Sequence, residues 1–198
     1  MWKKPLLKFY LLIITVVFLP SVSFNLVHAS EFTADIIQNM GGMTIKGKIF
    51  VKGKNYRQEI NMAGTKQIVV FLGDKGTALM LMPDNMMYME MPAGKDTKKD
   101  PMMDQKRLEK IAEKKSLGKE KVNGYHCQKL RYTFHDKSLG TTTQWFSKKL
   151  NFPIKIEADG PSGRMSTEYK NIKEKKVPDS LFTIPSGYKK MSMPDMGM

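Results

Sequence analysis

The sequence predicts a mainly β fold of the α+β class, in which one antiparallel sheet curls into a half-barrel and a short amphipathic helix lies over its mouth. Three observations support this prediction. Short segments of alternating polar and apolar residues recur along the chain, turn sequences separate them, and one segment has helical periodicity. A sheet of about nine or ten hairpin-linked strands twists strongly and therefore curls.

The first predicted strands have one solvent-exposed face. In the segment 45–52, Ile45, Ile49 and Val51 occupy one side and lysines occupy the other. A period of two is typical of a strand with one buried face. A glycine-containing turn follows, and the segment 56–62 repeats the pattern.

The next strands are apolar on both sides. The segments 68–72 and 78–82 contain no charged residue, and the turn 73–76 joins them as a hairpin. A further strand is predicted at 86–91. A strand that is apolar on both faces is covered on both faces. One cover can be the helix of the domain, and the other could be a bound apolar ligand or a partner.

The segment 101–115 is predicted to be the helix. No Gly or Pro follows Pro101 within it, helix-forming residues dominate, and Leu108, Ile111 and Ala112 share one face. We predict that this helix is a lid, with Leu108 and Ile111 facing inward. After Gly118 strands are predicted again, at 124–134, 141–147, 153–158 and 165–172.

The N-terminus predicts export. Three lysines precede an apolar run at 11–19, and Val27-His28-Ala29 is typical of a signal peptidase site. We therefore predict a cleavable signal peptide at 1–29 and a periplasmic location. Residues 30–190 are predicted to form a single domain, and 191–198 a disordered, methionine-rich tail.

The chain is strongly basic, with 33 Lys and Arg against 19 Asp and Glu and a net charge of +14. The predicted signal peptide holds three of the basic residues, so 30 remain against 19 and the net charge is +11. This excess favours anionic surfaces such as lipid headgroups. Nucleic acid is not an expected partner of an exported protein. The alternative is that the lysines only solvate the surface.

Catalytic signatures are scarce. The only histidines after residue 29 are His126 and His135, and the chain has no nucleophile elbow, zinc-protease helix or phosphate-binding loop. Cys127 is the only cysteine, so we expect a small buried apolar residue rather than a disulfide. The sequence predicts a non-catalytic monomer without a cofactor.

The predicted ligand contacts are apolar and aromatic residues of the strands, which would form the wall of a hollow. Burying an acyl chain against such a wall gains about 0.8 kcal/mol per methylene group. The eight predicted wall residues are Ile49, Ile60, Val70, Leu79, Tyr88, Tyr132, Trp145 and Ile156.

Methionine is unusually frequent, with 17 residues, and Met-x-Met pairs recur. Thioether sulfurs suit Cu(I). For the pairs within strands, the favoured interpretation is that Met lines an adaptable apolar surface. For the tail, a Cu(I) site stays open as the alternative. Its ligands would be Met191, Met193, Met196 and Met198.

Several motifs carry a resemblance to a known group. They are 47–52, 68–70, 73–75, Pro83 and Tyr88 in the first half, and 181–185 with Gly187 at the end. These resemble the periplasmic lipoprotein carriers of the LolA/LolB-like superfamily. The middle, with 117–120, 124–127 and Trp145-Phe146, is closer to uncharacterised exported domains related to them. The resemblance implies an incurved half-barrel with helices over its mouth, which takes acyl chains and catalyses no reaction. The implied ligand is a lipid or an acylated protein.

The chain departs from the carriers at one position. They tend to have Arg directly after the residues that match Val51-Lys52, where it helps to hold the lid. Here Gly53 follows, and Arg57 lies four residues further on. This departure argues against lipoprotein transfer in the strict sense but not against apolar binding. A copper-binding protein and a partner-docking sensor or adaptor on the same scaffold are the alternatives.

Overall fold

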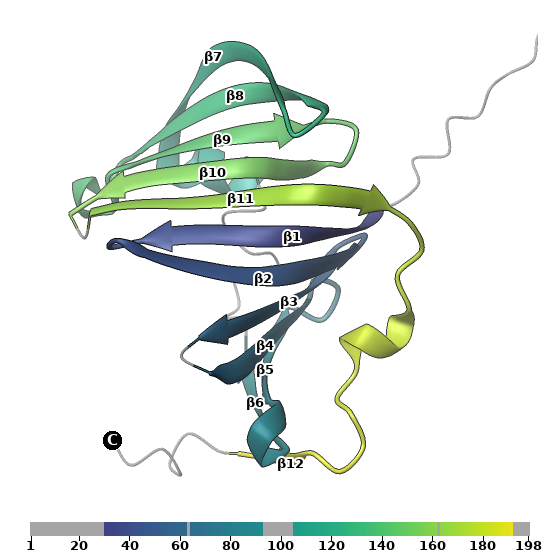
Figure 1. Cartoon of the computed structure of the whole chain (residues 1–198). Coiled ribbons are helices and arrows are strands. Elements are labelled where there is room, and N and C mark those ends of the chain that lie inside the picture. Colours follow the sequence, from purple (N-terminus) through teal and green to yellow (C-terminus); the bar gives the residue numbers. More distant parts are fainter. Residues whose placement is uncertain (1–29, 63, 93–104, 162, 192–198) are drawn as a thin grey trace, which may run out of the picture.

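The described strands form a single open sheet. The computed structural model describes residues 30–62, 64–92, 105–161 and 163–191. Twelve strands follow the order β12-β6-β5-β4-β3-β2-β1-β11-β10-β9-β8-β7 across the sheet (Figure 1). All neighbours pair antiparallel except β12, which runs parallel to β6. The predicted mainly β, curled antiparallel sheet is confirmed.

The strands have the following bounds: β1 (Glu31–Met40), β2 (Met43–Lys52), β3 (Asn55–Met62), β4 (Thr65–Leu72), β5 (Thr77–Met82), β6 (Met87–Pro92), β7 (Ala112–Val122), β8 (Tyr125–Phe134), β9 (Thr141–Ser147), β10 (Phe152–Gly160), β11 (Gly163–Glu174) and β12 (Lys189–Lys190). The helices are α1 (Gln105–Ile111) and the 3₁₀ turns η1 (Pro83–Asn85), η2 (Lys137–Leu139) and η3 (Asp179–Phe182). Among the described residues, no helix has the length and apolarity that a membrane crossing requires.

Strand β1 lies at the centre of the sheet, between β2 and β11. The sequence predicts short strands from about residue 32 onward, but no separate bounds for this one. Phe32, Ala34 and Ile36 are all buried and alternate with half-buried residues. This period-two signal was present in the sequence. The strand begins two residues after the predicted cleavage site.

The helix is shorter than predicted. It ends at Ile111, and residues 112–115 belong to β7, so the helical prediction for them was wrong. Residue 112 pairs with Phe134, and the ladder continues to the pair Val122 and Tyr125 at the start of β8. Helix propensity is a weak preference that tertiary pairing overrides. The exposed Lys and Glu side chains of β7 are typical of an edge strand. Residues 101–104 lie outside the described part.

The two faces of the sheet have different covers. Helix α1 lies behind the sheet in Figure 1, and its fully buried Leu108 packs with Leu130 and Tyr132 of β8. We call this side the inner face. Residues 175–188, the C-terminal arm, pack on the opposite side, the outer face, where Val177 and Phe182 join a buried cluster. Ile111, in contrast to the prediction, is 39% exposed.

Strands β2 and β3 approach each other closely at Gly47. A Cβ atom at this position would lie 2.2 Å from the carbonyl oxygen of Glu59 and 2.8 Å from Cγ2 of Ile60. Only glycine fits there without displacing the backbone of the next strand.

Candidate functional site

The predicted wall residues do not share one face. Side chains directly opposite each other on paired strands point to the same side of a sheet, so the register assigns their faces. Ile49, Ile60, Tyr132 and Ile156 lie on the inner face. Ile49, Tyr132 and Ile156 are buried, and Ile60 is half-buried.

Three other predicted wall residues, Val70, Leu79 and Tyr88, lie on the outer face. Val70 pairs with Arg57 and Leu79, one position out of phase with the inner-face residues. All three belong to the cluster beneath the C-terminal arm, with Val177 and Phe182. A single hollow therefore cannot contain all eight residues. The strands β4 and β5 are apolar on both sides because the apolar arm covers their outer face.

Trp145, the eighth residue, lies on the same side of the sheet as Lys129 and Lys155, with which it pairs. Their ammonium groups lie 4.8 Å and 4.5 Å from its ring centroid. Its indole Nε1 donates a hydrogen bond of 2.8 Å to Glu120. These contacts are cation–π and polar. The side chain is also 4% exposed and belongs to the buried cluster that contains Cys127 and Ile154, so its role there is structural.

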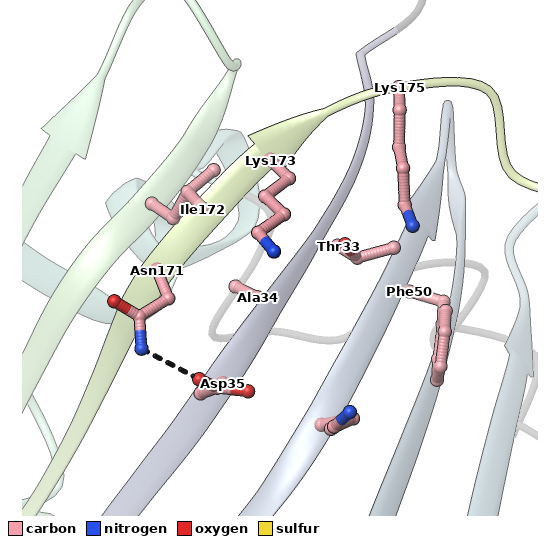
Figure 2. Close-up of a pocket in the computed structure, with 9 residues that line it drawn as sticks. Thr33, Ala34, Asp35, Phe50, Asn171, Ile172, Lys173 and Lys175 are labelled. Atoms are coloured by element: carbon pink, nitrogen blue, oxygen red, sulfur yellow. Dashed lines mark hydrogen bonds between the residues drawn. The ribbon is translucent and has the colours of Figure 1, made fainter.

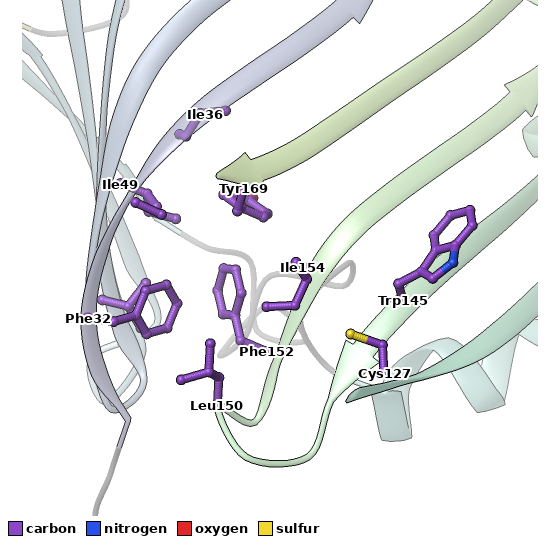
Figure 3. Close-up of a cluster of buried hydrophobic side chains, with 11 residues drawn as sticks. Phe32, Ile36, Ile49, Cys127, Trp145, Leu150, Phe152, Ile154 and Tyr169 are labelled. Carbon is purple, nitrogen blue, oxygen red and sulfur yellow. The ribbon is translucent and has the colours of Figure 1, made fainter. Parts of the chain in front are cut away.

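The middle of the inner face is a packed core (Figure 3). Phe152 makes edge-to-face contacts with Phe32 and with Tyr169, each at 5.1 Å between ring centroids. Leu150 and Ile154 lie in the same cluster and are buried. Aromatic side chains from β1, β10 and β11 thus fill this region with one another.

The inner face of β5 and β6 is lined by methionine instead. Val69 lies opposite both Gln58 and Met80, and Gln58 lies opposite Ile49, so Met80 is on the inner face. Met80 pairs with Met89 in turn. We call the inner-face methionines of these two strands the methionine wall. Its members are Met80, Met82, Met87, Met89 and Met91.

The methionine wall is only partly covered. Met89 is 7% exposed and Met87 is 37% exposed, and the other members are half-buried. Its sequence signal was the Met-x-Met repeat, which places two sulfurs on one side of β5 and three on one side of β6. Only the register between β5 and β6 brings the two sets together.

Tyr132 adds a polar group to the inner face near α1. Its hydroxyl is buried and has no hydrogen-bond partner among the described residues. Burial, with a smaller contribution from the negative charge of Glu109, raises the pKa of Tyr132 to about 12. The hydroxyl therefore stays protonated, which suits hydrogen bonding and not proton transfer at neutral pH.

On the outer face, Arg57 anchors the C-terminal arm. The side chain is 8% exposed, and one guanidinium nitrogen donates to the backbone carbonyl of Leu181 at 3.0 Å. Nε donates to Glu59 Oε1 at 2.7 Å, and Lys66 contacts the other carboxylate oxygen at 2.9 Å. Arg57 thus holds the arm against β3.

This ion pair makes stability depend on pH. Burial alone would raise the pKa of Glu59, but hydrogen bonds from Lys66 and Arg57 outweigh burial and lower it below 4.5. A lowered folded-state pKa gives stabilisation that is complete above the unfolded value and is lost as the pH falls through the folded value. We expect the difference in free energy of unfolding between wild type and Glu59→Gln to shrink from neutral to acid pH in urea titrations. A constant difference would contradict this prediction.

The described residues offer no metal site of the usual kind, since no three His, Cys, Asp or Glu side chains converge among them. Cys127 is buried, as predicted, and burial raises the pKa of its thiol. Met191 donates its backbone N–H to the carbonyl of Tyr88 at 2.8 Å. The other three predicted copper ligands, Met193, Met196 and Met198, lie outside the described part, as does the predicted signal peptide.

Several solved structures resemble this chain to different degrees. An uncharacterised conserved protein of Thermus thermophilus is 9% identical with a TM-score of 0.59, over 82% of this chain and 90% of that one. MucB of Pseudomonas aeruginosa, solved in complex with MucA, is 16% identical with a TM-score of 0.53, over 78% and 56%. A LolA superfamily protein of Nitrosomonas europaea is 15% identical with a TM-score of 0.37, over 79% and 91%.

The family comparison covers most of the chain. No curated protein sequence matches it. One family model matches residues 33–151 and 147–188, and its description is a domain of unknown function. The predicted likeness to an uncharacterised domain family is thus confirmed by the family model, and the structures with TM-scores above 0.5 share the fold. On this evidence, the chain belongs to the family DUF4412.

Proposed function

We propose that this protein is an exported, non-catalytic binding protein that holds a lipid, a lipidated chain or another apolar ligand on the inner face of its sheet. The observation that carries the proposal is the methionine wall, a half-covered apolar surface beside the buried apolar clusters of the same sheet. Export rests on the charged, apolar and small-residue pattern of residues 1–29.

Methionine suits such a surface. Its unbranched side chain has three rotatable bonds and a polarisable sulfur, so it adapts to ligands of different shape. The wall has no charged member. An acyl chain laid across it would gain about 0.8 kcal/mol for each methylene that leaves water, and this gain must exceed the cost of ordering the chain.

Two alternatives use other features. The cross-strand pair Met80 and Met89 would present two thioethers to Cu(I). A protein partner is the other candidate, since MucB, which shares the fold, was solved in complex with MucA. The apolar ligand is preferred because the wall extends over five residues of two strands, more than one metal ion needs.

We expect Met80→Glu to weaken binding of a fluorescent fatty acid by at least about tenfold, because a carboxylate would be desolvated against the bound chain. Native mass spectrometry should show lipid-range mass co-purifying with the wild type, prepared without detergent, and absent from the variant.

The matched control is Met86→Glu, at a methionine that is 53% exposed in the turn before β6. It should bind like the wild type. Equal binding by Met80→Glu would contradict the proposal. A clean wild-type mass that takes up Cu(I) stoichiometrically would favour the copper site, and a mass that takes up neither would favour the protein partner.

A further inference from the structure

The outer face carries a surface pocket that the proposed function does not use. It has a volume of about 530 Å³ and lies over β11, β1 and β2 (Figure 2). Lys48, Lys173 and Lys175 line it, together with a single carboxylate, that of Asp35. The lining therefore carries more positive than negative charge.

A β-bulge in β11 creates this arrangement. Thr33 of β1 pairs with Lys173, whereas Asp35 pairs with Lys170, so two positions on β1 correspond to three on β11. Residues three apart on a regular strand point to opposite faces. The extra residue of the bulge brings both Lys170 and Lys173 to the outer face. Asn171, within the bulge, has a positive φ of 51°.

Among the described residues, the lysines beside the pocket form ion pairs with carboxylates, whereas the lysines that line it do not. Lys170 contacts Glu168 at 3.5 Å, and Lys52 contacts Asp179 at 2.7 Å. None of the three pocket lysines forms an ion pair with a described residue.

The one carboxylate in the pocket has a neutral partner. Oδ2 of Asp35 accepts a hydrogen bond of 2.8 Å from the side-chain amide of Asn171, as Figure 2 shows. The lysine ammonium groups are therefore available to an external anion.

We propose that this pocket binds a phosphate group, either free phosphate or the headgroup of an anionic lipid. Ammonium groups form strong, charge-assisted hydrogen bonds to phosphate oxygens. A pocket of this volume is within the range of small-molecule sites and exceeds what inorganic phosphate alone would fill. Phe50 forms part of the lining and offers an apolar surface to the organic remainder of a phosphate ester. This second site is independent of ligand binding on the inner face.

The test is calorimetric titration with inorganic phosphate, and co-sedimentation with phosphatidylcholine vesicles that do or do not contain phosphatidylglycerol. Replacing Lys48 and Lys173 together by Gln should weaken phosphate binding by at least about tenfold, because the variant loses two charge-assisted hydrogen bonds that stabilise the bound phosphate. Asp35→Asn should strengthen it, because a repulsive charge is removed. Both lysines are exposed, so folding should be retained.

The control is the double variant Lys119→Gln, Lys121→Gln, which removes two exposed lysines of β7 and lowers the net charge equally. It should bind phosphate like the wild type. If the Lys48 and Lys173 double variant loses binding to both phosphate and phosphatidylglycerol vesicles, the pocket is a lipid headgroup site. If only phosphate binds to the wild type, the pocket is a free-phosphate site. Absence of binding to both probes, or an equal loss in the control, overturns the proposal.

Discussion

Replacing Val70 by Asp is expected to destabilise the protein by about 3 kcal/mol or more, since a carboxylate would be buried without a partner. Val70 is fully buried on the outer face. It lies in the cluster formed by β4, β5 and the C-terminal arm, with Val177 and Phe182. The free energy of unfolding, measured by urea denaturation, should fall sharply, and the arm should become sensitive to protease.

The neighbouring residue provides a matched control. Val69 is the same residue type on the same strand, but it faces the inner side, lies opposite Met80 and is half-buried. Val69→Asp should therefore cost much less stability than Val70→Asp and should weaken fatty-acid binding instead. If Val70→Asp folded normally and lost ligand binding, our assignment of the two faces would be refuted.

Replacing Arg57 by Ala is expected to destabilise the protein by about 3 kcal/mol, because it breaks a largely buried ion pair and removes the donor to the Leu181 carbonyl. The side chains of Arg57 and Glu59 are 10% and 19% exposed. Glu59 would keep only Lys66 as a charged partner. Urea denaturation measures the loss, and limited proteolysis reports whether the arm detaches.

The variant Lys52→Ala tests whether burial is the reason for the large loss of stability expected in Arg57→Ala. Lys52 also joins the sheet to the arm, through Asp179 at 2.7 Å, but the two side chains are 30% and 86% exposed. Solvent screens such a pair, so the variant should unfold almost like the wild type. Similar losses in Arg57→Ala and Lys52→Ala would contradict the view that Arg57 is the anchor of the arm.

The Arg57 anchor also bears on the departure at Gly53. The resemblance to the carriers implies an arginine directly after Lys52 that helps to hold the lid. Here the buried arginine lies on β3 and holds the C-terminal arm on the outer face, while α1 packs through Leu108 on the inner face. Nothing in the local sequence distinguishes these roles, because the partner of Arg57 is 124 residues away along the chain.

The sequence by itself determined most of the strands, the turns and the curled antiparallel sheet, because period-two alternation and turn chemistry are local properties. It also indicated the unusual methionine content and the absence of catalytic motifs. It failed for residues 112–115, where pairing with β8 prevailed over helical periodicity.

Only the tertiary structure decided which face each apolar residue serves. Alternation separates Val69 from Val70 but does not say which side the helix covers and which side the arm covers. The register of β5 with β6 assembled the methionine wall from two separate repeats. The bulge at Asn171 moved Lys173 to the outer face against the simple alternation. These features depend on pairing between distant segments and on one inserted residue, and the periodicity of a single strand contains neither.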